Sequence, residues 1–599
     1  MLKQLNKLRP LFSRKDKFRY MGLLGLMGIG AILEVAGISA VPAFIATLAV
    51  PEKVRALPYA EQVLSALGIE TATGLVVWGA IGLVIVFAIR ASYMIFLQYA
   101  QIRMTEHHRV RMARLLFDAY MRAPYEFHLG RNTAELLRNV NNETTSIITG
   151  IINPILALTL NSMMTLGIVG VLIYATPWSG LVAVGIVGGG SWLFLRAVRS
   201  RMSKYGVEAR EERKKAIQAV NQGLGGFLDA RVLGVEETLV EEFHGSVARF
   251  ARYNRFQQFI GKLSNPLLEF IAVGGLMLVV LSMVLSGMDL ATMVPMLGLF
   301  GAAIVRLRSS VGTITATISG LSYNMASVDA VVDDLKLLKH DSFKADLDNS
   351  RDRRQLPFTD EIRVDNLTYS YPDAHTPSLS DISLSIKKGE SVGFVGATGS
   401  GKTTMINVVL GLLEPQRGSI TVDGTNIREE LRAWQNNIGY IPQSIYLLDD
   451  TIRKNVAFGI PEERIDDEKV WTAIRAAQID HHIEGLPDGL ETYVGERGVR
   501  LSGGQRQRIG LARALYNNPD VLIMDEATSA LDNETESLVM QALDALKGDR
   551  TLIMIAHRLS TVMECDRLYF LKNGRIDARG TYDELRSAHG EFRKMANVE

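Results

Sequence analysis

The stretch Gly396-Ala397-Thr398-Gly399-Ser400-Gly401-Lys402-Thr403 has the G-x-x-x-x-G-K-[ST] spacing of a phosphate-binding loop. An apolar run, Ser391–Val395, precedes it and a helix-prone run, Thr403–Leu412, follows it, as this motif requires. Glycines let backbone N–H groups turn toward phosphate oxygens, and the positive end of the following helix faces the same anion. Lys402 is expected to reach the β- and γ-phosphates, Thr403 to ligate Mg²⁺, and Thr404 to contact the nucleotide. By itself the loop predicts bound ATP or GTP.

A second apolar run, Val521–Asp525, ends in the two acids Asp525 and Glu526. A continuous apolar run of this length is typical of a strand buried on both faces of a parallel sheet. Asp525 would then lie at the carboxyl end of the strand, where it can hold Mg²⁺. Glu526 is expected to polarise the attacking water.

A third motif narrows the class of nucleotide-binding protein to which this chain is expected to belong. Leu501-Ser502-Gly503-Gly504-Gln505 resembles the signature sequence of ATP-binding-cassette (ABC) proteins, which marks one branch of the phosphate-loop ATPases. The resemblance covers about residues 360–595. It implies that Ser502–Gln505 of one subunit close over a nucleotide that the phosphate loop of another subunit holds.

Five further segments resemble elements of the same family and occur in the family's order. The resemblance implies that Tyr371 stacks on adenine and that Gln443 contacts Mg²⁺ and senses the membrane domain. It implies that Val494–Gly498 lies near the cytoplasmic crossing helices and that Ser529–Asp532 contacts the opposite subunit. His557 matches the histidine that contacts the γ-phosphate, so the expected catalytic groups are Lys402, Glu526 and His557.

Length and composition agree with more than one domain. The 599 residues exceed one ordinary domain, and a formal net charge of +1 gives no field that would attract nucleic acid. The single cysteine excludes an intrachain disulfide framework. The mean hydropathy of +0.12 averages an apolar first half and a soluble α/β second half. We expect a transmembrane domain over residues 1–330, a linker over 331–359 and a nucleotide-binding domain over 360–599.

The first half contains apolar runs suited to membrane-spanning helices, which need about 20 residues each. There are six such runs, roughly Tyr20–Val50, Gly74–Tyr99, Ser146–Ala175, Gly180–Val198, Pro266–Leu285 and Leu290–Val305. Arg and Lys gather before the first run and after the second, fourth and sixth, which places both termini in the cytosol.

The two connections predicted to be cytoplasmic, 101–145 and 199–262, are polar and helix-prone. We therefore expect the spanning helices to continue into the cytosol, with breaks at Ala123–Gly130 and Gly223–Gly226. A short crossing helix at each break would be placed to touch the ATPase domain.

Charged residues inside the spans bear on the substrate, because such residues usually face a cavity or a partner. They are Glu34, Arg90 and Glu269, with Arg306 at the inner end of the sixth run. Two alternatives remain open. Either the charges pair and hold helices together, or Arg90 and Arg306 line a cavity and bind an anionic headgroup such as pyrophosphate through their guanidinium forks.

The loop Pro51–Thr73 includes Tyr59–Leu67, which suits either an amphipathic helix at the outer membrane surface or an ordinary loop. Together with Arg90, the basic end of the sixth run and Glu208–Ala216, it resembles bacterial flippases for lipid-linked oligosaccharides. That resemblance implies ATP-driven flipping across the inner membrane by alternating access. General lipid or multidrug export, peptide export and an ATP-gated channel are the alternatives.

Six spans fused to one cassette resemble the exporter architecture of the ABC family. One phosphate loop and one signature per chain then imply a homodimer with two composite ATP sites. The expected cofactors are ATP and Mg²⁺, and the expected partners are a second copy of the chain, membrane lipids and an amphipathic substrate. A heterodimer with another half-transporter is the alternative.

Overall fold

The structure is a computed structural model. It describes residues 12–49, 71–175, 177–285, 290–324, 332, 334, 354–372, 374–526, 533–556 and 558–596. The chain divides into two compact units: one comprises residues 1–122 and 132–340, and the other comprises 123–131 and 341–599. Most of the predicted linker, and all of the predicted outer helix Tyr59–Leu67, lie outside the described residues. The domain boundaries at 330 and 359 stay predictions.

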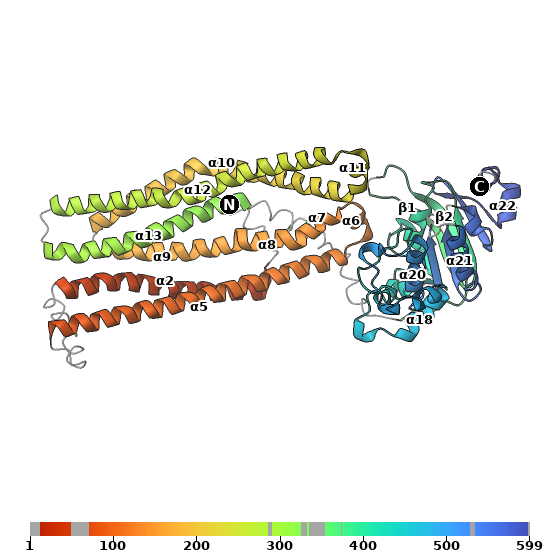
Figure 1. The fold of residues 1–599 in the computed structure, drawn as a ribbon, viewed down its shortest axis with the longest axis horizontal. Coiled ribbons are helices and arrows are strands. Elements are labelled where there is room, and N and C mark those ends of the chain that lie inside the picture. Colours follow the sequence, from red (N-terminus) through yellow and green to blue (C-terminus); the bar gives the residue numbers. More distant parts are fainter. Residues whose placement is uncertain are drawn as a thin grey trace. The chain divides into compact units, whose positions relative to one another are not determined.

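The first unit is helical. Five of the six predicted spans fall in single long helices, and the third begins in shorter helical segments that lead into α9. Within the described ranges these helices are α2 (Arg14–Ala49), α5 (Ala72–Met121), α9 (Asn153–Ala175), α10 (Pro177–Gly225), α12 (Glu236–Leu285) and α13 (Leu290–Asn324). α2 packs along α5, α9 along α13 and α10 along α12, so the helices run side by side as Figure 1 shows. A buried apolar cluster that includes Ile38, Leu172 and Phe300 joins α2, α9 and α13.

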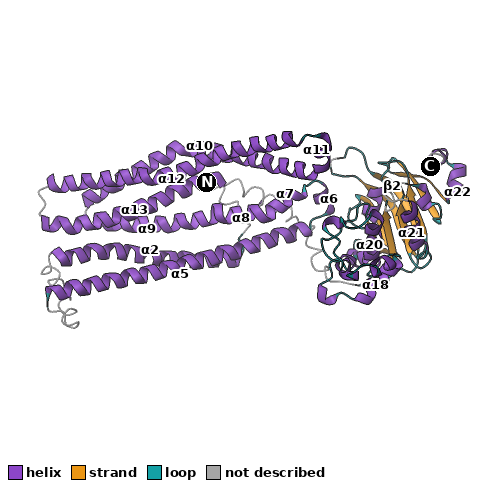
Figure 2. Cartoon of the chain, viewed as in Figure 1, coloured by secondary structure: helices purple, strands orange, loops and turns teal. Residues whose placement is uncertain are grey.

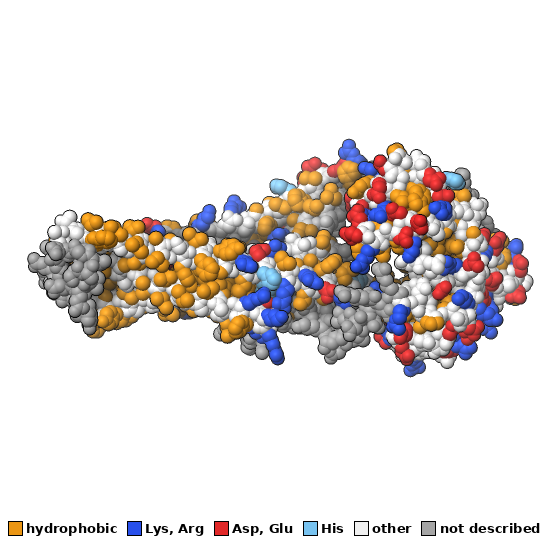
Figure 3. Space-filling model, turned by 90° about the horizontal axis from the view of Figure 1, so that it is seen from below, with side chains coloured by type: hydrophobic (Ala, Val, Ile, Leu, Met, Phe, Trp, Pro, Cys, Tyr) orange, Lys and Arg blue, Asp and Glu red, His pale blue; other side chains and the backbone are white. Residues whose placement is uncertain are grey.

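The helices extend far beyond a bilayer. α5 and α12 have 50 residues each, which corresponds to about 75 Å of helix against a hydrocarbon core of about 30 Å. The prediction that the spans continue as helices through the polar connections is confirmed. In Figure 3, hydrophobic side chains cover a broad band of this unit, and Lys and Arg gather at one end of the band.

Four helical stretches of the described residues are long and apolar enough to cross a membrane. They are Arg14–Ile45, Ala72–Met121, Thr133–Ala175 and Met296–Ile318. The predicted spans Gly180–Val198 and Pro266–Leu285 lie in α10 and α12, where several side chains fall outside the described set.

The third span differs from a plain helix. The stretch before α9 comprises α7 (Thr133–Arg138), α8 (Thr144–Ile147) and the π-helical segments η2 (Asn139–Glu143) and η3 (Ile148–Ile152). Pro154 lacks the N–H that would bond to the Gly150 carbonyl, and the Thr149 hydroxyl donates to the Thr145 carbonyl at 2.9 Å. Both features loosen the regular ladder of hydrogen bonds, which accounts for the π-helical turn of η3.

A short helix lies within the first predicted break, and another directly follows the second. α6 (Tyr125–Leu129) follows Pro124 at its N-terminal cap, and α11 (Phe227–Leu233) ends at Gly234, whose φ of +66° suits glycine. α6 belongs to the same compact unit as the ATPase half, as the sequence predicts for a helix that touches it.

The second unit is an α/β domain with two sheets, seen as strands between helices in Figure 2. The smaller sheet is antiparallel, in the order β2-β1-β4-β5, and the larger has the order β10-β9-β3-β8-β7-β6, with only β10 antiparallel. The strands are β1 (Glu361–Tyr369), β2 (Leu379–Lys387), β3 (Ser391–Val395), β4 (Arg417–Val422), β5 (Thr425–Asn426), β6 (Ile438–Ile441), β7 (Val521–Asp525), β8 (Thr551–Ile555), β9 (Arg567–Lys572) and β10 (Arg575–Gly580).

Helices flank these sheets in the second unit. They are α15 (Lys402–Val409), α16 (Leu431–Asn436), α17 (Ile452–Val456), α18 (Asp467–Ala476), α19 (Asp480–Glu484), α20 (Gly503–Leu515), α21 (Asn533–Asp544), α22 (Tyr582–Ala588) and α23 (Gly590–Ala596).

The burial of the strands follows the sequence patterns. Every residue of β3 and β7 is buried, as predicted for central parallel strands, whereas β1 alternates as predicted for a strand with one covered face. The predicted helix Thr403–Leu412 is shorter in the structure, because α15 ends at Val409 and Gly411 has a φ of +70°.

Candidate functional site

The order of the parallel strands brings the phosphate loop and the two acids to one edge of the sheet. β8 lies between β3 and β7, and its residue Ile555 pairs with Phe394 on one side and with Asp525 on the other. The carboxyl ends of β3 and β7 are therefore level. The loop that follows β3 and the acids that end β7 meet there.

The phosphate loop needs its glycines for steric reasons. Gly401 has a φ of +106°, and a Cβ there would meet the Ser378 carbonyl oxygen at 2.7 Å. Gly399 has a φ of +80° but faces open space, with no described atom within 4 Å of the position that a Cβ would take. The Ser400 hydroxyl is buried and has no hydrogen-bond partner among the described residues. The loop thus forms a cradle with an unsatisfied polar group, which fits a bound phosphate.

Lys402 opens α15 and is buried beneath this loop. Its Nζ donates to the carbonyl oxygens of Gly396 at 2.7 Å and Ala397 at 3.2 Å. Burial lowers the pKa of the ammonium, while the nearby carboxylates of Glu526 and Asp525 oppose that shift. A phosphate would supply the compensating charge that Lys402 lacks.

The two acids occupy different environments. Asp525 is buried, and its pKa is raised to about 6, first by desolvation and then by the Glu526 carboxylate, while Lys402 lowers it. Glu526 has a left-handed backbone with a φ of +48°, and its Oε2 accepts a hydrogen bond of 2.7 Å from Gln443 Nε2. The structure therefore brings together Lys402, Asp525, Glu526 and Gln443 as the sequence predicts.

The predicted Mg²⁺ ligands are Thr403, Gln443 and Asp525. Each can offer an oxygen, the donor that Mg²⁺ prefers. Thr403 and Gln443 are exposed, and Asp525 is the buried last residue of β7. This donor set fits the ion. Its binding stays a proposal.

The predicted adenine-stacking residue also lies at the loop. The Tyr371 hydroxyl is 3.4 Å from the Thr404 hydroxyl in the first turn of α15, and its ring meets that of Tyr369 edge-on at 5.1 Å. Contact with adenine remains a prediction. His557 and Ser529–Asp532 lie outside the described residues, so their roles also remain predictions.

The signature motif forms the start of α20, a helix of 13 residues. Ser502 caps this helix, because its hydroxyl accepts from the Gln505 N–H while the Gln505 side chain accepts from the Ser502 N–H. Ser502 and Gly503 are exposed. The helix start is therefore presented on the surface, and the hydrogen bonds found for Ser502 in the described residues are those of its own cap.

The crossing helix α6 contacts the ATPase sheet at a residue that sequence reasoning missed. The buried Tyr369 hydroxyl donates to Glu126 Oε1 at 2.6 Å, and Tyr125 packs against the same core. Burial is the main cause that raises the pKa of Tyr369, and the hydrogen bond to Glu126 raises it further. The only sequence signal is an aromatic at the end of the first strand.

Replacement of Tyr369 by phenylalanine is expected to loosen α6 without disturbing the sheet. A hydrogen bond to a charged group contributes about 1.5–3 kcal/mol, so amide hydrogen exchange in Tyr125–Leu129 should quicken by about tenfold or more. Tyr569→Phe is a matched control, because that buried hydroxyl bonds to the Ser385 carbonyl instead. Equal exchange of α6 in both variants would contradict this role.

The charged residues of the membrane unit pair with one another. Glu34 is 1% exposed, and its two oxygens each accept a bond of 2.8 Å from Arg90, in a bidentate pair. Arg306 Nε lies 2.5 Å from Glu34 Oε1 as an ion pair, without the alignment of a hydrogen bond. Arg308 pairs with Glu269 at a more exposed position. The pairing alternative is thus present in the structure, and two cations share one carboxylate.

A parallel sheet with a phosphate loop and paired acids, joined to a unit of long apolar helices, defines a membrane-bound ATPase. The family model of the ABC transporter matches residues 379–529, and that of the ABC transporter transmembrane region matches residues 59–307. A bacterial Atm1-family ABC exporter with ATP bound shares the fold, with a TM-score of 0.74, 24% identity and coverage of 97% of this chain and 98% of its own.

Curated relatives include proteins named ATP-dependent lipid A-core flippase. That of Cupriavidus metallidurans is 31% identical and that of Thiobacillus denitrificans 30% identical, over 82% and 80% of this chain and 82% of each relative. A putative multidrug export ATP-binding/permease protein of Staphylococcus aureus is 44% identical over 40% of this chain and 41% of its own.

The chain therefore belongs to the ABC transporter family. It has the architecture of an ABC exporter, a transmembrane domain followed by a nucleotide-binding domain, and it is an ATPase coupled to transmembrane transport.

Proposed function

We propose that this chain is half of a homodimeric flippase of a bacterial inner membrane, and that its substrate is a lipid-linked oligosaccharide. The observation that carries the substrate proposal is the charge cluster Glu34–Arg90–Arg306. One buried carboxylate faces two arginines, so the cluster carries a net positive charge among apolar helices.

Glu34 covers the side chains of the two arginines only in part. Their side chains are 25% and 27% exposed, for Arg90 and Arg306 respectively, whereas Glu34 is enclosed. An anionic group that approached from the exposed side would find guanidinium donors of the kind that bind phosphate bidentately. A diphosphate-linked lipid headgroup meets this requirement, and a cationic or neutral drug does not.

The cycle follows from the nucleotide site. Lys402 and the phosphate loop would hold ATP on one subunit, and the exposed start of α20 in the second subunit would close over it. Because this closed dimer contacts ATP through more groups than an open one, ATP favours closure. Glu526 then orients and polarises water at the end of β7, and loss of the γ-phosphate releases the dimer. α6, bonded to Tyr369, would carry the movement to the membrane helices.

Reconstituted protein provides the test. ATP hydrolysis should rise when liposomes contain a polyprenyl diphosphate oligosaccharide, and its headgroup should change leaflet only with ATP. Arg90→Gln should reduce both effects, whereas Arg308→Gln, which alters the exposed pair with Glu269, should not. If amphipathic drugs stimulate hydrolysis and lipid-linked sugars do not, the multidrug alternative that the Staphylococcus relative suggests replaces the flippase proposal.

A further inference from the structure

Two adjoining cavities lie within the membrane unit, and each is lined in part by a helix that also carries an arginine of the charge cluster. One has a volume of about 520 Å³ and is bounded by α5, α9 and α13, and the other has about 380 Å³ and also touches α12. They share the residues Thr149, Pro154 and Thr317. Both volumes lie within the range of small-ligand sites, about 300–1,000 Å³.

The larger cavity has mostly apolar walls, and its described lining residues carry no charge. Among the described lining residues, the hydrogen-bonding side chains are four amides and two hydroxyls: Gln98, Gln101, Thr149, Asn153, Asn161 and Thr317. An apolar drug would leave these amides without partners, and an anion would find no opposite charge. A ligand that combines apolar surface with groups that both donate and accept hydrogen bonds matches these walls.

Several side chains that line the two cavities have oxygen atoms that can still accept hydrogen bonds. Thr149 and Thr313 donate their hydroxyls to the carbonyls of Thr145 and Ser309 within their own helices, which leaves oxygen lone pairs available. The Asn161 amide likewise donates to the Ala157 carbonyl at 2.9 Å. Asn153 Oδ1 has no hydrogen-bond partner in the described part of the chain. The walls can therefore accept hydrogen bonds from hydroxyl groups.

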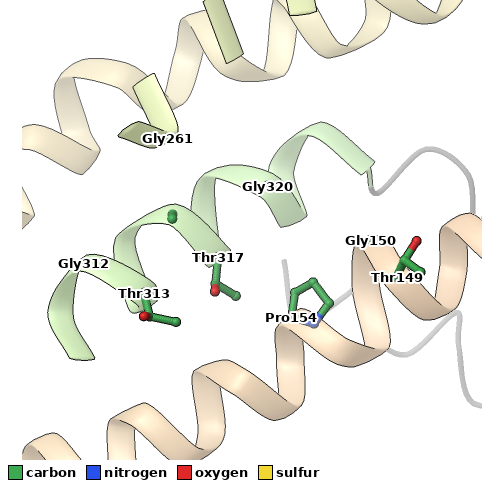
Figure 4. A pocket seen from close by; sticks show the side chains of 9 residues that line it. Thr149, Gly150, Pro154, Gly261, Gly312, Thr313, Thr317 and Gly320 are labelled. Atoms are coloured by element: carbon green, nitrogen blue, oxygen red, sulfur yellow. The ribbon is translucent and has the colours of Figure 1, made fainter. Parts of the chain in front are cut away.

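The smaller cavity has room because glycines line it. Figure 4 shows Gly261, Gly312 and Gly320 around Thr313 and Thr317, with Thr149 and Gly150 on the facing helix. A Cβ added at Gly261 or Gly320 would meet no described atom within 4 Å. Thr149 and Gly150 belong to the π-helical segment η3, a conformation that is frequent at functional sites.

Along α5 and α13, the residues that line the cavities lie C-terminal to the arginines of the charge cluster. Gln98 follows Arg90 by about 12 Å along α5, and Thr317 follows Arg306 by about 16 Å along α13. Both displacements run toward the C-terminal ends of their helices, which the positive-inside rule places in the cytosol. A substrate whose anionic group meets the arginines would thus extend its polar head into the cavities.

We propose that these two cavities bind the uncharged, polyhydroxylated sugar portion of the substrate headgroup. This inference rests on the proposed flippase function and deepens it, because it separates a glycan subsite from the anion subsite at Arg90 and Arg306. Sugar hydroxyls both donate and accept hydrogen bonds, which suits the amide and hydroxyl side chains in the cavity walls. The glycines that line the smaller cavity leave space for a sugar ring.

Direct binding is the test that is independent of transport. A neutral glycosyl lipid without phosphate is titrated into protein held in lipid nanodiscs, beside a polyprenyl diphosphate without sugar. Gly320→Val places two methyl groups into the open space and should weaken glycosyl-lipid binding about tenfold, the equivalent of one or two lost hydrogen bonds, while leaving the diphosphate lipid unaffected. Gln98→Leu should act in the same direction.

Gly170→Val is the matched control, since Gly170 is an exposed α9 glycine whose Cβ also meets no described atom within 4 Å. It should bind both lipids as the unaltered protein does. The glycan subsite is overturned if the unaltered protein binds no glycosyl lipid, or if Gly320→Val and Gln98→Leu leave glycosyl-lipid binding unchanged or weaken both lipids equally. Absence of ATP-dependent flipping alongside selective glycosyl-lipid binding would instead overturn the flippase proposal and leave the subsite standing.

Discussion

Replacement of Glu526 by glutamine is expected to leave ATP binding intact and to slow hydrolysis by about 10²–10⁴-fold, the range for loss of a general base. The amide keeps the length of the side chain, and its oxygen can still accept the 2.7 Å hydrogen bond from Gln443. Lys402 and the phosphate loop are untouched, so the nucleotide is held. Hydrolysis and binding of a fluorescent ATP analogue, measured on the same preparation, separate the two effects.

A second glutamate provides the control for this variant. Glu564 is 77% exposed, pairs with Lys547 on the surface of the same domain and should tolerate glutamine without change in either measurement. Lys402→Ala should instead lose binding together with hydrolysis. Turnover of the Glu526 variant at the rate of the unaltered protein would show that another group activates the water.

Removal of the Glu34 charge should cause a large loss of stability in the membrane unit. Glu34→Gln leaves Arg90 and Arg306 close together without an anion, and breaking a buried ion pair from one side costs about 3–5 kcal/mol. The lower end of that range is expected, because each arginine is about one quarter exposed and retains some water. Chemical or thermal unfolding in detergent, followed by the loss of helical circular dichroism, measures the change.

Glu269→Gln removes a membrane-unit carboxylate of a different kind. Its pair with Arg308 has exposures of 58% and 38%, so the expected loss is below about 1 kcal/mol. The double variant Glu34→Gln with Arg306→Gln should recover part of the stability, because one unpaired cation is removed. Equal stability of the Glu34→Gln and Glu269→Gln variants would mean that the pairing of Glu34 with the two arginines does not stabilise the membrane unit.

Most of the ATP site was predictable because its residues are contiguous or follow strands. Gly396–Thr403 needs only its own glycines and the helix that follows it, and Asp525 is fixed by the end of an apolar strand. Gln443 was identified only through a family resemblance. Its bond to Glu526 depends on β6 lying beside β7, which no local pattern encodes.

The helices outside the ATPase sheets were predicted less completely. Apolar length located the six long helices, and the breaks at Pro124 and Gly226 located the two short ones. The π-helical turns before α9 were missed, since they arise from Pro154 and from threonine hydroxyls that bond to preceding carbonyls. The amides could have been noticed as uncharged polar residues, with Gln98 at the end of one apolar run and Asn161 in the middle of another.

The sequence by itself determined the chemistry of this protein: a phosphate loop, two acids at a strand end, a signature helix, and apolar runs long enough to cross a membrane. Each of these is a local pattern whose physical requirement lies within a few neighbouring residues. Only the tertiary structure decided that Glu34 pairs with both Arg90 and Arg306, that Tyr369 bonds to Glu126, and that uncharged amides from α5 and α9 line one cavity. These contacts join residues far apart in the chain, and helix packing rather than local periodicity brings them together.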